Sequence, residues 1–160
     1  MSDFQSMKAI MMKSILAEPA MTDRMLWLTD LCSECESPIE KDMVTALLDD
    51  EALNKGLRPN IAGKKFARQS ESDVLIRVQM PVGGYRADIA VSIDGGRRVV
   101  VECDGIEFHD RTPKRFIAER QRDREFLILG WPTMRFTGAE ITRNPAACAR
   151  EVVEYLRGAA

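Results

Sequence analysis

An apolar stretch of the chain ends in two carboxylates and a glycine, and the only histidine of the protein follows. The run is VVVECDG at residues 99–105, and IEFHD follows it at 106–110. Carboxylates at the mouth of a buried strand are costly, because a charged group loses hydration there. A metal ion or a proton transfer is the usual reason to place them so. Glu102, Asp104 and His109 therefore predict a site of chemistry.

A β-hairpin would bring a third carboxylate to the same place. Strands at 86–93 and 97–104, joined by the loop Asp94-Gly95-Gly96, pair Ile93 with Arg97 and hence Asp88 with Glu102. A one-residue slip would reverse the faces of a strand, and the hydrophobic pattern favours the first register. That register makes one face apolar, with Ala87, Ile89, Val91, Val99, Val101 and Cys103. The other face carries Asp88, Ala90, Ser92, Arg98, Val100, Glu102 and Asp104.

The acidic face of this hairpin predicts a bound cation. Asp88 and Glu102 would be cross-strand neighbours, roughly 5 Å apart at Cβ, and Asp104 lies two residues further along. Like charges at that distance repel one another unless positive charge lies between them. Mg²⁺ is the usual cation for oxygen ligands, and we expect Mn²⁺ to substitute for it. The alternative is that the acids form salt bridges with Arg86, Arg98 or the arginine-rich segment that follows.

The elements that position these residues follow from periodicity and capping signals. Ser37 is a good N-cap, Pro38 suits the first helical position, and Glu40 completes a capping box. Pro19 is expected to end the first helix. The predicted helices are 3–17, 22–31, 37–53, 113–129 and 145–157, and the predicted strands are 61–68, 74–80, 86–93, 97–104 and 133–136. Residues 81–84 are predicted as a turn. This order is typical of an α/β or α+β sandwich.

Composition sets the limits of the interpretation. The 160 residues, 45% of them hydrophobic, suit one domain with a helical appendage. No apolar run would span a bilayer and no signal peptide is evident, so we expect a cytoplasmic protein without membrane contact. The four cysteines lack the spacing of a disulfide framework, so reduced thiols are expected, and zinc or redox chemistry at the Cys32-Cys35 pair is the alternative. The net charge of −2 lacks the signature of many nucleic-acid binders, although arginines cluster between 111 and 124.

Asp88 on one strand and Glu102-x-Asp104 on the next resemble the PD-(D/E)XK nuclease superfamily. The wider pattern is QMPVGGYRAD at 79–88, VECDG at 101–105, FHDRT at 108–112, RDR at 122–124 and RFTGAEI at 135–141. It is similar to small bacterial proteins related to the very-short-patch mismatch-repair endonuclease and to the EDxHD homing endonucleases. The resemblance implies a restriction-endonuclease-like three-layer core, with a mixed β-sheet flanked by helices. The domain would span 37–160, after an N-terminal helical extension at 1–36.

The same resemblance implies roles for individual residues. Asp88 and Glu102 would bind the metal together with Asp104, and Glu40 would touch the metal or its water if it does more than cap its own helix. Asp104 stands where the superfamily often has lysine, so the general base is open between Asp104 and His109. Asp123 would bind the metal, orient His109, or pair with a neighbouring arginine.

These roles imply a metal-dependent DNA endonuclease that hydrolyses phosphodiester bonds with a Mg²⁺-activated water. Arg111, Lys114 and Arg115 would contact DNA phosphates. The alternative is a non-catalytic DNA-binding or protein-interaction module that kept the nuclease fold. The methionine-rich N-terminal helix would serve as core or as the contact of a homodimer.

Overall fold

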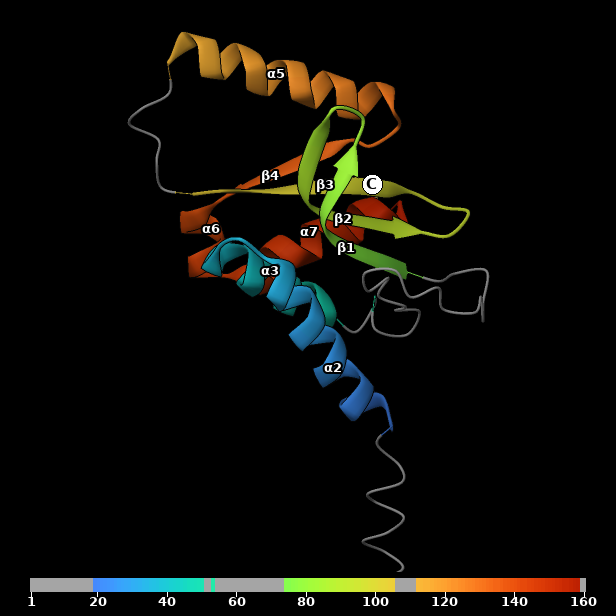
Figure 1. The fold of residues 1–160 in the computed structure, drawn as a ribbon. Helices are drawn as coiled ribbons and strands as arrows, with labels where there is room; N and C mark the ends of the chain where they lie inside the picture. The colour runs from blue at the N-terminus through green and yellow to red at the C-terminus, as the bar shows by residue number, and fades with distance from the viewer. Residues whose placement is uncertain (1–18, 51–52, 54–73, 106–111, 159–160) are drawn as a thin grey trace, which may run out of the picture.

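The computed structural model describes residues 19–50, 53, 74–105 and 112–158 (Figure 1). Two helices, α2 (Pro19–Glu34) and α3 (Pro38–Asp49), precede the sheet. The strands are β1 (Val74–Val82), β2 (Tyr85–Ile93), β3 (Arg98–Asp104) and β4 (Thr133–Thr137). The remaining helices are α5 (Pro113–Ile128), α6 (Gly138–Arg143) and α7 (Pro145–Arg157). The predicted helix 3–17 and strand 61–68 lie outside the described residues.

The four strands form one mixed sheet in the order β1-β2-β3-β4. The first three strands run antiparallel, and β4 pairs parallel with β3. A parallel pair needs a crossover connection, and α5 lies in the segment that joins β3 to β4. The predicted α/β class with a mixed sheet flanked by helices is confirmed.

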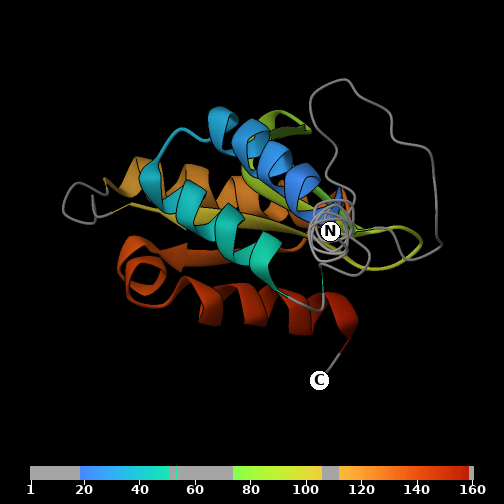
Figure 2. The ribbon, with the colours of Figure 1, turned by 90° about the horizontal axis from the view of Figure 1, so that it is seen from below.

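Helices cover both faces of the sheet, which gives three layers. α5 lies over one face, and α3, α6 and α7 lie over the other (Figure 1). Seen from below, α3 and α7 lie side by side across the sheet (Figure 2). The larger apolar cluster fills the space under α3 and α7, and the C-terminal part of α2 joins it through Leu31, which is 1% exposed. A smaller cluster lies under α5 around Phe126, which is fully buried.

The predicted register of the β2–β3 hairpin is confirmed. Ile89 pairs with Val101 and Val91 with Val99, and the Ile93 amide donates to the carbonyl of Arg97 across the loop at 2.9 Å. Gly95 takes the left-handed conformation that the three-residue loop needs, with φ of +70°. The paired positions end at Ile89 and Val101, and just beyond them the amide of Asp88 donates to Oε1 of Glu102 at 3.4 Å.

One residue of the predicted apolar face lies on the other side. Ala87 packs in the cluster under α5, whereas Ile89 packs under α3 and α7. The facing strand shows the cause, because Val78 and Met80 also belong to different clusters. Gln79 between them has φ of +51°, in the left-handed region, and this conformation rotates β1. The buried side chains of β1 and β2 therefore change from one face of the sheet to the other at Gln79 and Asp88.

Several elements differ from the sequence prediction; α3, for example, ends at Asp49 rather than at 53. α2 begins at Pro19, three residues before the predicted start at Thr22, since a proline in the first turn lacks only an amide that has no helical partner. The helix that Pro19 was predicted to end lies outside the described residues. β1 continues through Pro81 to Val82, because the missing amide of a proline is tolerated on an edge strand. The short helix α6 was not predicted, although Thr137 and Glu140 form its capping box.

Within the described part of the chain, no helix has the length and apolar character needed to cross a bilayer.

Candidate active site

Asp88 and Glu102 line one cavity of about 380 Å³ between the sheet and α5. A backbone amide of each strand donates a hydrogen bond to the carboxylate of the other strand. The Cys103 amide donates to Oδ2 of Asp88 at 2.9 Å, and the Asp88 amide faces Oε1 of Glu102 at 3.4 Å. Asp104 lines the same cavity. The structure therefore brings the three predicted acidic residues of the hairpin together.

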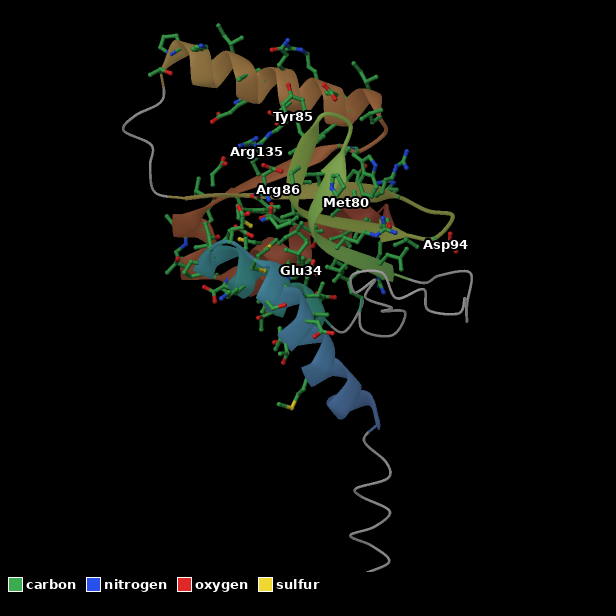
Figure 3. All side chains as sticks on the ribbon, in the orientation of Figure 1. Glu34, Met80, Tyr85, Arg86, Asp94 and Arg135 are labelled. Carbon is green, nitrogen blue, oxygen red and sulfur yellow. The ribbon has the colours of Figure 1, made fainter. Side chains whose placement is uncertain are left out.

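Two arginines enter this cavity from outside the hairpin. Arg122 of α5 donates from Nη2 to Oε2 of Glu102 at 2.5 Å. Arg135 of β4 binds both oxygens of Asp104, with Nε at 3.0 Å from Oδ2 and Nη2 at 2.7 Å from Oδ1. Figure 3 shows Tyr85 and Arg135 on the side of the sheet that faces α5. The alternative prediction was that the acids pair with arginines, and Glu102 does pair with Arg122 of the arginine-rich segment. Arg86, another predicted partner, pairs instead with Glu36.

The electrostatics of the cavity still disfavour its two central carboxylates as anions. Burial raises the pKa of Glu102 to about 7, and the negative charge of Asp88 raises it further, while Arg122 and Arg135 act in the opposite direction. Burial also raises the pKa of Asp88, and Glu40 and Asp104 add to the effect. Glu102 is only 2% exposed. Burial therefore disfavours the ionised form of both carboxylates, and a bound cation would stabilise that form.

Glu40 lies behind the cavity rather than on its wall. Its carboxylate accepts hydrogen bonds from the Ser37 hydroxyl, the Glu36 amide and the Gln79 side chain, and the residue is 5% exposed. Ser37 caps α3 as predicted, but Glu40 returns to the amide of Glu36 rather than to that of the cap residue, so the predicted capping box is modified. Glu40 affects the cavity electrostatically, because its negative charge contributes to the raised pKa of Asp88.

The other candidates lie around this centre. Asp123 accepts from Arg135 at 3.0 Å and from Arg120 at 3.3 Å, so the arginine-pairing role considered for it is present. Lys114 is exposed in the first turn of α5. His109 and Arg111 lie outside the described residues, as does the side chain of Arg115. Among the described residues, no three histidine, cysteine or acidic side chains form a preassembled metal site.

The cysteines give no support to the zinc or redox alternative. All four are free thiols. Burial raises the pKa of the Cys35 thiol to about 12, with a smaller contribution from Cys32. A thiol binds zinc or attacks a disulfide as the thiolate, which this environment disfavours.

Arg135 was not predicted as part of the site. Its signal in the sequence is an arginine within the short strand TMRFT, where the pairing with β3 sets it beside Glu102. It joins three elements, because it holds Asp104 of β3 and Asp123 of α5 from β4.

Arg135→Gln should destabilise the protein, since it leaves two partly buried carboxylates without their shared cation. We expect a loss of about 1–2 kcal/mol in the free energy of unfolding at pH 8, measured by urea denaturation. Arg150→Gln, which removes an exposed arginine from α7, is the control and should change stability by less than about 0.5 kcal/mol. Equal losses in both variants would show that Arg135 has no special role.

A restriction-endonuclease-like family model, REase_MTES_1575, matches residues 66–156. The chain belongs to this family. The matched segment of the REase_MTES_1575 family includes the whole sheet and the cavity residues Asp88, Glu102, Asp104 and Arg135. Glu40 precedes it. No curated protein and no solved structure matches the chain. Membership in the REase_MTES_1575 family supports a nuclease-type protein, and the closer relation to very-short-patch and EDxHD endonucleases stays a prediction.

Proposed function

We propose that the protein is a divalent-metal-dependent DNA endonuclease related to the very-short-patch and EDxHD enzymes. One observation carries the proposal. Asp88 and Glu102, neighbours on antiparallel strands, line a single cavity in which burial and mutual repulsion raise the pKa of Glu102 to about 7. Among the described residues, Asp88 has no ion-pair partner. Carboxylate oxygens in such a setting suit Mg²⁺ or Mn²⁺.

The residues of the chain would divide the reaction among them. A divalent cation at Asp88 and Glu102 would neutralise phosphate charge and acidify the attacking water. Arg135 binds both oxygens of Asp104, so this carboxylate is poorly placed to take a proton from the water. We therefore assign proton removal from the water to His109, whose ordinary pKa suits neutral pH. Attack on phosphorus breaks one P–O ester bond, and the leaving oxygen takes a proton from solvent.

DNA would approach the cavity along the first turn of α5. Lys114 is exposed there, and we propose that Lys114, Arg115 and Arg111 bind phosphates on either side of the scissile bond. Such contacts fix the position of the duplex without reading its sequence.

The non-catalytic alternative also has an observation in its favour. Arginines neutralise Glu102 and Asp104 in this structure, and a binding module would need no other cation there. The two functions differ in whether the cavity takes up a divalent ion.

Calorimetric titration with Mn²⁺ and a plasmid-cleavage assay separate the two functions. The endonuclease should bind Mn²⁺ and nick or linearise plasmid DNA with Mg²⁺, and chelation with EDTA should stop cleavage. Cleavage that persists in EDTA would contradict metal dependence. No Mn²⁺ binding and no cleavage, with DNA still bound, would establish the non-catalytic module.

A further inference from the structure

Arg122 is poorly satisfied where it lies. It gives one N–H to Glu102, and its Nε is buried without a hydrogen-bond partner. The side chain is 23% exposed, and its guanidinium lies 6.0 Å from the centre of the Phe126 ring. A guanidinium carries five N–H donors, and a buried donor without an acceptor is unfavourable. Arg122 therefore occupies this position with most of its binding capacity unused.

The second arginine of the cavity shows the contrast. Arg135 uses Nε and Nη2 on Asp104 and Nη1 on Asp123. It also extends from β4, which is hydrogen-bonded to β3 in the sheet, whereas Arg122 extends from the helix that covers the cavity. Arg135 makes three hydrogen bonds to two carboxylates, whereas Arg122 makes one to a single carboxylate. Moving the Arg122 side chain therefore breaks fewer interactions.

We propose that Arg122 is an exchangeable counter-ion that passes from Glu102 to a phosphate of the nucleic acid when a divalent cation binds. This inference rests on the proposed function and assigns Arg122 a part in it. In the resting site Arg122 neutralises Glu102. A divalent cation at Asp88 and Glu102 takes over that neutralisation, and the planar guanidinium fork is then matched to phosphate oxygens. No covalent bond is made or broken, because the exchange involves only ion pairs and hydrogen bonds.

The exchange predicts opposite effects on two affinities. Arg122 competes with the divalent cation for Glu102, so removing its charge should tighten cation binding. The same removal should weaken DNA binding, because one phosphate contact is lost. A merely structural arginine would not produce this opposition.

The test compares Arg122→Gln with Arg124→Gln, which removes the same charge from an exposed position of α5. Mn²⁺ affinity is measured by calorimetry without DNA. Duplex DNA affinity is measured by fluorescence anisotropy in Ca²⁺, which is used to retain binding without cleavage. Arg122→Gln should bind Mn²⁺ at least about fivefold more tightly than wild type and DNA about fivefold more weakly. Arg124→Gln should leave the Mn²⁺ affinity within about twofold of wild type.

A second variant keeps the test decisive if Arg122→Gln folds poorly. Arg122→Lys retains the charge but loses the planar fork, so Mn²⁺ affinity should stay close to that of wild type while DNA affinity falls. Unchanged or weaker Mn²⁺ binding by Arg122→Gln, with wild type binding normally, would overturn the exchange and leave the endonuclease proposal intact. Absence of Mn²⁺ binding by wild type and both variants would overturn the two proposals together.

Discussion

Asp88→Asn should abolish DNA cleavage and, without metal, make the protein more stable. The substitution removes one of the two carboxylates proposed to hold the cation, so we expect cleavage to fall by a factor on the order of 10³. The asparagine oxygen can still accept the hydrogen bond that Asp88 takes from the Cys103 amide. Loss of the Asp88 charge also removes a cause of the raised pKa of Glu102. Stability at pH 8 should rise by on the order of 1 kcal/mol, or about 2–4 °C in Tm.

The control for this variant is Glu151→Gln, which removes an exposed carboxylate from α7 on the opposite face of the sheet. It should keep the activity and the Tm of wild type. Calorimetric Mn²⁺ titration should detect binding by the control and little or none by Asp88→Asn. Retained nicking by Asp88→Asn in the presence of Mg²⁺ would contradict the metal role of Asp88. A lower metal-free Tm would contradict the view that the two carboxylates repel each other.

Glu102→Gln should flatten the dependence of stability on pH. The pKa of Glu102 is raised from 4.5 to about 7. Below pH 4.5 the folded and unfolded chains both hold this proton, and the contribution of the group to stability is fully present. As the pH rises to about 7, the unfolded chain releases the proton first, so the free energy of unfolding falls. The loss from this group should amount to about 2–3 kcal/mol and should level off above pH 7.

Urea denaturation of the metal-free proteins at intervals between pH 4.5 and 8 measures this loss. Wild type and Glu151→Gln should lose stability across the interval. Glu102→Gln should lose markedly less, because glutamine does not titrate. Parallel profiles for wild type and Glu102→Gln would show that the carboxyl of Glu102 ionises in the folded protein as it does in the unfolded chain.

The hairpin and its acidic residues could be predicted because local rules fix them. The loop at 94–96 contains Gly95, and the two-residue alternation of β2 and β3 allows only one register that buries the apolar side chains. The helix α3 was predicted for a similar reason, since Ser37 caps it and Pro38 suits its first position. Each of these signals lies within a few residues of the element it controls.

The counter-ions could not be predicted because they depend on contacts between distant segments. Arg122 lies 20 residues from Glu102, and Arg135 lies 31 residues from Asp104. Their meeting requires the parallel pairing of β3 with β4 and the placement of α5 over the sheet. No local pattern encodes which arginine of a charged helix faces inward. The rotation at Gln79 was also missed, since a positive φ at glutamine has no sequence signal.

The rotated strand links the two halves of the molecule thermodynamically. Val78 belongs to the apolar cluster on one face of the sheet and Met80 to the cluster on the other. Neither cluster can melt without disturbing the backbone of the same strand. The helices α5, which contains Arg122, and α3, which contains Glu40, should therefore unfold in one cooperative transition. No intermediate in which α5 alone has unfolded should be populated.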